Sequence, residues 1–427
     1  PGEPTPAPTA RPTPTPIPTL PPGTSVTYYQ DVAPIISSRC IQCHNPTGIA
    51  AGYALDTFAK AQTLAQSMKF ATNARRMPPW GPNEDGSCEN FKSSRYLSTL
   101  EIQKITAWAD NGTPMGTVAP TPTPNPGQTL ANPTISGTMA VPFNPVRSSG
   151  DDYQCFNLPV TVLDTGLTLT PNLFVTGFEV VPGNRKVLHH VIAWVTQPRA
   201  DIDAVIAAKE NEDAAPGWEC LGSHGLPVNA ETVALWAPGT DAITYPAGTG
   251  IAVSRDNTRL IIQAHYSTAL LAPAESAVDQ TGIRLKLGVD GLGTKIARWI
   301  PTGTQAINLA PGQPNVNVTT TNTLAGFLGL PAISVAGTIW GVYPHMHRRG
   351  TSITFTKPLV PACLMDVPRW DFNWQTAYFY QTPLQVNTSE TFRVSCNYNT
   401  VGATQPVVYG ENTDNEMCFV FLYATQN

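Results

Sequence analysis

Most of the chain carries apolar residues in short runs that alternate with polar ones. After residue 130, runs such as "LFVTGFEVV", "RLIIQAHYSTALL", "TFRVSCNYN" and "CFVFLYAT" are separated by Gly, Pro and Asn. Apolar positions with a period of two between turn-forming residues predict the antiparallel strands of a β-sandwich. The pattern continues for about 300 residues, which favours two sandwiches over one because a single core rarely grows so large. We expect these sandwiches at residues 131–285 and 286–427.

The first part of the chain has helical periodicity instead. In "LSTLEIQKITAWADNG" the apolar residues recur every three or four positions, which is the spacing of an amphipathic helix. Ser98 and Glu101 predict a capping box at its start, and Gly112 predicts its end. Residues 25–115 are therefore expected to form a small all-α domain, so the whole chain is predicted to be multidomain.

Two segments rich in Pro and Thr flank this domain, at residues 1–24 and 116–130. Such a composition predicts an extended, semi-rigid linker rather than a packed structure. The first segment is either a spacer that holds the folded part away from a surface or partner, or a simple mobile tail.

The chain has few charged residues and no basic stripe. Of its 427 residues, 13% are charged, and the formal net charge is −5. This balance argues against nucleic acid or an anionic membrane surface as a partner. The apolar runs are strand-sized, whereas a transmembrane helix needs about 20 apolar residues, so we expect no transmembrane segment. The chain begins with Pro1 and shows no hydrophobic signal region, which we interpret as an exported product whose signal lies outside this sequence.

The predicted helical domain contains a C-x-x-C-H motif. In "RCIQCH", Cys40 and Cys43 have the spacing that attaches haem through two thioether bonds, with His44 as an axial iron ligand. Further along, "RRMPPW" places Met77 on an extended Pro-Pro segment as the second axial ligand, although Met68 lies in the same region. The alternatives are a thioredoxin-like dithiol and half of a zinc site. Neither a strand–helix–strand pattern nor a second Cys/His pair accompanies the motif, so we favour covalently bound haem c.

Residues 25–115 are similar to class I c-type cytochromes. A haem with His and Met ligands has a fairly high reduction potential and suits one-electron transfer. Covalent attachment of this kind implies assembly on the exported side of a bacterial membrane. We therefore expect a periplasmic, extracellular or outer-surface protein of a bacterium.

The remaining histidines are concentrated in the region of predicted strands. The chain has seven histidines in total, and His224 stands alone as an expected loop residue. Five others fall in three short motifs: "LHHV" (His189, His190), "QAHYS" (His265) and "YPHMHRRG" (His345, His347). Clusters of neutral imidazoles are typical of metal sites.

The spacing within these motifs sets a geometric condition. His345 and His347 are two residues apart, so on a strand they point to the same side and can bind one ion. His189 and His190 are adjacent and would point to opposite sides. They can share an ion only if the strand is bulged or ends there.

From residue 131 to 427 the chain resembles the copper type II, ascorbate-dependent monooxygenases, whose members include peptidylglycine α-hydroxylating monooxygenase and dopamine β-monooxygenase. The motifs "HHV", "QAHYS", "HMH" followed by Gly350, and "NEMCF" occur in the family's order. The resemblance implies two copper ions, an electron-storing one and one that binds dioxygen. Their ligands would be His189, His190 and His265 for the first, and His345, His347 and Met417 for the second. A thioether ligand independently favours Cu(I), and zinc has no reason to bind Met417.

The resemblance also implies the architecture and the reaction. We expect two jelly-roll-like antiparallel sandwiches, with one copper on each, facing across a cleft open to solvent. The activity would be hydroxylation of a C–H bond with O2, and the family's usual electron donor is ascorbate. Our hypothesis is that the fused haem replaces or supplements ascorbate, with the Pro/Thr linker tethering the two parts. Oxygen sensing and exchange with an external cytochrome are alternative roles for the haem.

Three positions depart from the peptide-processing members of the family. Tyr343 stands where they carry an arginine, and Phe419 and Phe421 replace an asparagine and a tyrosine that bind the substrate carboxylate. The resemblance therefore argues against a peptidylglycine and favours a small apolar or aromatic substrate. The alternative is that Phe419 and Phe421 only pack in the sandwich core.

Eight cysteines allow up to three disulfides beside the C-x-x-C-H pair. Cys396 and Cys418 match a bridged pair of the family, which would brace the strand that presents Met417. Cys155 with Cys220 is a weaker candidate, and Cys88 and Cys363 remain unassigned. Two other functions stay open, namely a copper-handling or electron-transfer protein without hydroxylase activity, and a scaffold attached through its Pro/Thr segments.

Overall fold

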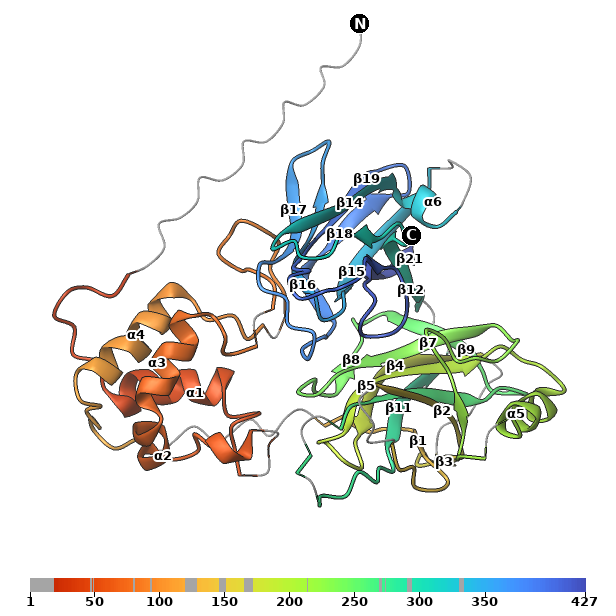
Figure 1. The fold of residues 1–427 in the computed structure, drawn as a ribbon, viewed down its shortest axis with the longest axis horizontal. Helices are drawn as coiled ribbons and strands as arrows, with labels where there is room; N and C mark the ends of the chain where they lie inside the picture. The colour runs from red at the N-terminus through yellow and green to blue at the C-terminus, as the bar shows by residue number, and fades with distance from the viewer. Residues whose placement is uncertain are drawn as a thin grey trace, which may run out of the picture.

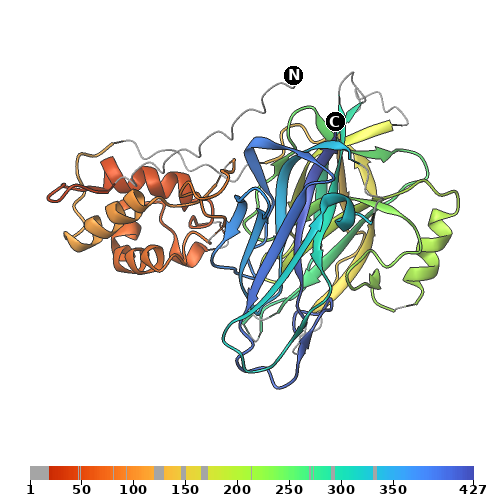
Figure 2. The same cartoon turned by 90° about the horizontal axis from the view of Figure 1, so that it is seen from above.

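The computed structural model describes thirteen stretches of the chain. These are residues 19–46, 48, 50–79, 81–92, 94–119, 129–145, 151–164, 172–212, 214–268, 271–272, 274–289, 294–329 and 334–427. Most of both predicted Pro/Thr linkers therefore lies outside the described residues. A helical N-terminal unit lies beside a larger part made of β-sheets (Figures 1 and 2).

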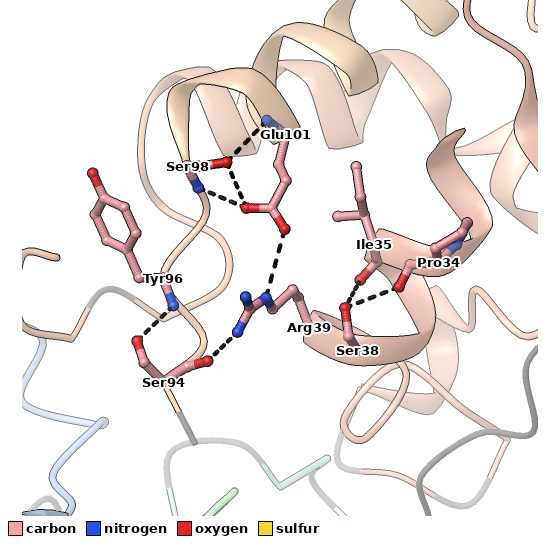
Figure 3. Close-up of polar contacts among 8 residues, drawn as sticks. All are labelled: Pro34, Ile35, Ser38, Arg39, Ser94, Tyr96, Ser98 and Glu101. Carbon is pink, nitrogen blue, oxygen red and sulfur yellow. Dashed lines mark hydrogen bonds and ion pairs between the residues drawn. The ribbon is translucent and has the colours of Figure 1, made fainter. Parts of the chain in front are cut away.

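The N-terminal unit consists of short helices around one apolar core. Its elements are a π-helical turn at Tyr28–Val32, α1 (Ala33–Arg39), a 3-10 turn at Ala51–Tyr53, α2 (Phe58–Thr63), α3 (Ala65–Asn73) and α4 (Thr99–Asp110). The predicted capping box is confirmed, because the Glu101 amide donates to Ser98 Oγ at 3.2 Å and the Ser98 amide donates to Glu101 Oε2 at 2.7 Å. Glu101 also faces Arg39 at the end of α1, which links the two helices (Figure 3). The side chain of Trp108 on α4 is fully buried in this core.

The β part is built almost entirely of short strands, as the alternating pattern predicts. The first half contains β1 (Ile135–Thr138), β2 (Asp152–Leu158), β3 (Val160–Val162), β4 (Asn172–Val181), β5 (Leu188–Thr196), α5 (Ile202–Glu210), β6 (Trp218–Glu219), β7 (Ala230–Trp236), β8 (Ile243–Thr244), β9 (Thr249–Ser254), β10 (Leu260–Tyr266) and β11 (Gly282–Val289). The second half contains β12 (Lys295–Thr304), β13 (Asn308–Leu309), β14 (Val316–Thr323), α6 (Leu324–Phe327), β15 (Ala336–His345), β16 (Gly350–Lys357), β17 (Ala362–Val367), β18 (Tyr378–Asn387), β19 (Thr391–Tyr398), β20 (Val407–Val408) and β21 (Cys418–Gln426).

One large sheet runs through both halves. Its strand order is β18-β15-β21-β12-β9-β4-β11-β1-β3, with β8 on β4. The halves join where β12 pairs with β9 in parallel, Lys295 opposite Thr249. The sheet β6-β2-β10-β5-β7 and this large sheet share one apolar core, and the sheet β14-β19-β16-β17 shares a second core with the strands β18, β15, β21 and β12. The β part is thus consistent with two sandwiches, whose common sheet is continuous.

The N-terminal unit is docked directly on the C-terminal sandwich. The segment 81–92 leaves the helices and adds Phe91 to the core of that sandwich, where Phe91 forms a β-bridge with Tyr380. Cys88, in the same segment, forms a disulfide with Cys363 on β17. The contact between the two parts is therefore packed and cross-linked, which goes beyond the tether that the sequence suggests.

Among the helices of the described ranges, none combines the length and the apolar character needed to cross a membrane.

Candidate metal centres

The first histidine cluster forms at a bulge in β5. His265 on β10 pairs with His190, but the next residue, Tyr266, pairs with Leu188. His189 is therefore an extra residue in the strand, and the alternation of side chains is broken at that point. This is the interruption that both imidazoles require in order to turn to the same side.

The three Nδ1 atoms of this cluster form a small triangle. They are 3.0 Å apart between His265 and His190, 3.1 Å between His189 and His265, and 3.3 Å between His189 and His190. Metal–imidazole bonds are about 2.0–2.1 Å long, so nitrogens this close together would be able to hold one ion in common. A neutral imidazole has a single N–H, so three converging nitrogens cannot all be satisfied by one another. The three nitrogens of His189, His190 and His265 are therefore close enough together to hold one metal ion.

The outer nitrogens of two of these rings lie close to oxygen atoms. His265 Nε2 lies 2.9 Å from Asp151 Oδ1, and His189 Nε2 lies 3.1 Å from Asn373 Oδ1. Tyr153 stacks on the His265 ring with a centroid distance of 4.1 Å. The Asn373 oxygen accepts from His189 Nε2, which fixes this ring's orientation and leaves its Nδ1 free to bind a metal, and the Asp151 carboxylate lies beside His265 Nε2.

Burial keeps these imidazoles neutral. Burial and, to a smaller extent, the neighbouring histidines lower the pKa of His189 to about 4 and the pKa of His190 well below its usual range. Burial also lowers the pKa of His265, although Asp151 opposes this effect. Neutral imidazoles with free lone pairs are the form that binds a metal.

The second cluster follows from the register of β15 and β21. Tyr343 pairs with Phe421, and His345 pairs with Phe419. Paired residues of antiparallel strands share one face. This pairing ends at His345 and Phe419, and His347 and Met417 lie two residues beyond it on their segments. The two rings of His345 and His347 lie edge to face with centroids 5.2 Å apart. The ends of two adjacent strands thus bring the two imidazoles together, with Met417 directly before the neighbouring strand β21.

Both rings of this cluster are also held by oxygen acceptors. His345 Nδ1 donates to Gln375 Oε1 at 2.7 Å, and His347 Nδ1 donates to the Asn415 carbonyl at 3.1 Å. The Nε2 atoms are therefore the unprotonated ones, which a metal can bind. Burial lowers the pKa of His345 to about 4 and that of His347 to about 3.

Glu416 connects the two chain segments of the second cluster, and sequence reasoning missed it. Its carboxylate accepts hydrogen bonds from three backbone amides, those of His347 (3.0 Å), Arg349 (2.6 Å) and Met417 (3.4 Å). The side chain is completely buried, and burial raises its pKa to about 7. The available signal was its place directly before Met417 in "NEMCF".

The strand that carries Met417 is held from two further sides. Tyr398 Oη donates to the Met417 carbonyl at 2.8 Å. Cys396 on β19 is bonded to Cys418, which is the pair implied by the family resemblance. The position of the thioether is therefore fixed by covalent and polar contacts of its neighbours.

The segment 371–375 of the C-terminal sandwich contacts both clusters. The Phe372 ring stacks on His189 at 4.7 Å and lies 6.0 Å from the His347 ring, measured between centroids. Asn373 accepts from His189, and Gln375 accepts from His345. The two clusters are thus bridged by protein at this point, whereas the resemblance implied a cleft open to solvent. We call residues 371–375 the bridging segment.

Comparison with known protein families finds a match for most of the C-terminal sandwich. Residues 298–426 match the family model "Copper type II ascorbate-dependent monooxygenase, C-terminal domain". The match covers β12 to β21 and includes His345, His347 and Met417. These ligands therefore lie in a region similar to a copper-dependent oxidoreductase domain.

Two curated relatives extend the similarity toward the first sandwich. A DBH-like monooxygenase protein 2 of Mus musculus is 23% identical over 290 residues, which is 64% of this chain and 42% of the relative. A similarly named Homo sapiens protein is 20% identical over 289 residues, which is 64% of this chain and 52% of the relative. The chain thus spans about half the length of these relatives. Both matches support the copper type II monooxygenase family.

Two solved structures of viral particles show remote likeness. The cowpea mosaic virus top component, a naturally occurring empty particle, aligns with a TM-score of 0.28 and 10% identity, covering 66% of this chain and 92% of its own. The infectious bursal disease virus VP2 subviral particle aligns with a TM-score of 0.18 and 10% identity, covering 70% and 73%. Likeness at this level carries no argument about the site.

Three aromatic residues lie on the same face as the His345–His347–Met417 set. Phe419 and Phe421 are half-buried, whereas their neighbour Val420 lies in the sandwich core. The Phe421 ring is 6.2 Å from the His345 ring and 6.3 Å from the Tyr343 ring, measured between centroids. The structure therefore places both phenylalanines on the face opposite the core, beside the metal ligands.

The residues of the C-x-x-C-H motif differ chemically from the other cysteines. Cys40 and Cys43 are the free thiols of the described residues. The other six cysteines form the pairs Cys88–Cys363, Cys155–Cys220 and Cys396–Cys418. His44 Nδ1 lies 2.8 Å from the Tyr53 carbonyl, which leaves Nε2 for a metal. Met77 is 41% exposed, whereas Met68 is buried in the helical core, so Met77 is the more accessible thioether.

Proposed function

We propose that this protein is a copper-dependent monooxygenase that hydroxylates a C–H bond of a small apolar or aromatic molecule. The balanced reaction is RH + O2 + 2 e⁻ + 2 H⁺ → ROH + H2O. The observation that supports the proposal is the triangle of three imidazole nitrogens together with the His345–His347 ring pair, both contacted by one bridging segment. The family match over residues 298–426 supports it.

The two ligand sets suit different tasks. His189, His190 and His265 would hold one copper ion, and His345, His347 and Met417 would hold the other. Copper bound there supplies one-electron redox chemistry and the activation of dioxygen. The soft thioether of Met417 would favour the reduced ion, whereas the other set would consist of imidazoles alone.

The residues around the sets orient the ligands and exclude water. Asn373 and Gln375 fix one imidazole of each set, and Phe372 fills the space between them. Glu416 and the Cys396–Cys418 disulfide hold the thioether strand. Such preorganisation keeps the ligand geometry constant as the charge of the site changes.

The aromatic face beside His345 supports an uncharged substrate. Tyr343, Phe419 and Phe421 offer apolar surface and ring edges but no cation for a carboxylate. Aromatic and alkyl groups pack well on such a surface. A peptide ending in glycine would lose its charge partner at these positions.

We further propose that Cys40, Cys43, His44 and Met77 hold a covalently bound haem c that supplies electrons. The two thiols are free while every other cysteine of the described ranges is oxidised, and the His44 ring is oriented by a backbone carbonyl. Ascorbate or an external cytochrome would be the outer electron donor. The three disulfides agree with an exported, periplasmic or extracellular protein.

An oxygen-uptake assay tests the proposed reaction. Copper-loaded full-length protein with ascorbate is given either alkylbenzene probes or acylglycine probes, and products are identified by mass spectrometry. We expect hydroxylated alkylbenzenes, no product from acylglycines, and loss of product in a His345→Ala variant. Two bound copper ions without substrate-dependent oxygen uptake for either class would instead identify a copper-handling or electron-transfer protein.

The haem has its own test. The alkaline pyridine spectrum of the purified protein should show haem c, and a Cys40→Ala, Cys43→Ala double variant should lack covalent haem. Covalent haem absent from the wild-type protein after expression with the haem-attachment machinery would refute this part.

A further inference from the structure

The C-x-x-C-H motif lies at the boundary between the N-terminal unit and the sandwiches. Gln42, between the two cysteines, donates from Nε2 to Asp241 Oδ1 in the loop between β7 and β8. Arg95 of the N-terminal unit contacts Gln42 Oε1 and donates to the Gly239 carbonyl at 2.8 Å. Asp241 faces Arg95 at 3.9 Å, so an ion pair adds to the contact. The haem-binding motif is therefore linked by polar contacts to the first sandwich.

The same arginine covers an indole of the other sandwich. The Arg95 guanidinium lies over the Trp374 ring, 5.1 Å from its centroid. Gly239 allows this packing, because a Cβ atom there would lie 2.1 Å from the Trp374 ring, and its φ of +82° also suits glycine. The boundary thus brings a residue of each of the three folded parts into contact at Trp374.

Trp374 lies between the two residues of the bridging segment that contact the imidazoles. The residue before it, Asn373, contacts His189, and the residue after it, Gln375, contacts His345. One indole therefore joins the haem-unit boundary on one side to an imidazole of each ligand set on the other. Electron tunnelling is faster through bonded and packed atoms than through solvent, which makes this bonded and packed connection a favourable route.

The disulfide between the N-terminal unit and the C-terminal sandwich does not offer a comparable route to the ligands. The Cys88–Cys363 disulfide leads to β17. β17 is an edge strand of the sheet β14-β19-β16-β17, and the ligands lie on β5, β10 and the ends of β15 and β21. The disulfide therefore holds the N-terminal unit in place but enters the sandwich on a different sheet from the one that carries His345.

We propose that Trp374, with Arg95 above it, is the electron entry point from the haem unit to the ligand sets. The proposal rests on the proposed function. In the step, one electron leaves haem Fe(II), which becomes Fe(III), and reduces one Cu(II) to Cu(I). No bond forms or breaks, and no proton or additional reactant is needed. The bridging segment thus has a second role beside orienting the imidazoles, and Trp374 is a positioning and relay residue rather than a ligand.

Flash reduction of the anaerobic full-length protein tests this assignment without measuring substrate turnover. The holoprotein, with haem and Cu(II), receives less than one electron per molecule from a photoreductant, and the haem band and the Cu(II) EPR signal are followed. We expect haem reoxidation with matching loss of Cu(II) signal in the wild type. It should be at least tenfold slower in Trp374→Leu and less than threefold slower in Trp374→Phe, which keeps an aromatic ring. Copper content, the haem spectrum and the thermal midpoint of each variant report a purely structural effect.

Arg95→Leu provides a second variant, which removes the guanidinium above Trp374 but keeps every residue of the bridging segment, including Asn373 and Gln375, which contact the imidazoles. Slower haem reoxidation at full copper content is expected here too. Wild-type rates in both Trp374→Leu and Arg95→Leu would overturn the route while the haem still acts as a donor. No haem reoxidation in the wild type would overturn the donor role of the haem as well, so the two failures are distinguishable.

Discussion

Replacing Glu416 with Gln removes one of the two oxygen atoms that connect the His347 loop to the Met417 strand. Oε2 accepts from the amides of His347 and Met417, and Oε1 accepts from the amide of Arg349. An amide side chain has one acceptor oxygen, and its NH2 group cannot accept. If the oxygen takes the Oε2 position, the Arg349 amide loses its partner, at a cost of about 1–3 kcal/mol for a buried donor.

We therefore expect Glu416→Gln to weaken Cu(I) binding at the His345–His347–Met417 set about tenfold, which corresponds to about 1.4 kcal/mol. The measurement is chelator competition at pH 8, where the raised carboxyl pKa of about 7 leaves Glu416 mainly ionised in the wild type. Affinity at the three-imidazole set, which lies on other strands, serves as an internal reference. X-ray absorption should show a weaker Cu–S contribution in the variant.

A matched control is available five residues earlier. Glu411 accepts a hydrogen bond from Tyr409 at 3.2 Å, and a Gln at position 411 would accept the same bond. Glu411→Gln is expected to keep wild-type Cu(I) affinity. If Glu416→Gln also kept both the affinity and the Cu–S signal, the carboxylate would not position the ligands and our reasoning would be refuted.

Three other changes test separate parts of the structure. His265→Ala should reduce bound copper from two ions to one per chain in dialysed protein, whereas the control His224→Ala should keep two. Two copper ions in the His265→Ala variant would contradict the three-nitrogen site. Cys396→Ser with Cys418→Ser should destabilise the C-terminal sandwich by about 3 kcal/mol, given a sequence separation of 22, and an unchanged urea midpoint would contradict this. Met77→Ala should keep covalent haem but lower its midpoint potential in a redox titration, since a Met ligand raises the potential; an unchanged potential would point to another axial ligand.

Local features of the fold were readable from short windows of sequence. The capping box of α4 depends on Ser98 and Glu101, three residues apart, and the strands depend on alternation over a few positions. The spacing of His345 and His347 likewise indicates a shared face without knowledge of the fold. Each of these depends on interactions within one turn of helix or one strand, so neighbouring residues suffice to predict it.

Contacts between distant segments were not readable in this way. Cys88 and Cys363 are 275 residues apart, and Phe91 belongs to the core of a sandwich that begins about 200 residues later. The sequence did not indicate that the bridging segment contacts both ligand sets. Its residues, "DFNWQ", contain no motif, and its role depends on the residues that pack against it. The contact of Gln42 with Asp241 was likewise not predictable, because the two residues are far apart in the sequence.

The sequence by itself determined the strand-rich architecture, the helical N-terminal unit and the chemical identity of the candidate ligands. Only the tertiary structure decided that His189 sits in a bulge beside His190, that Glu416 holds three amides, and that one segment touches both ligand sets. The physical reason is that periodicity and ligand type are properties of neighbouring residues. Convergence depends on strand register and on the packing of sheets, which many distant residues set together.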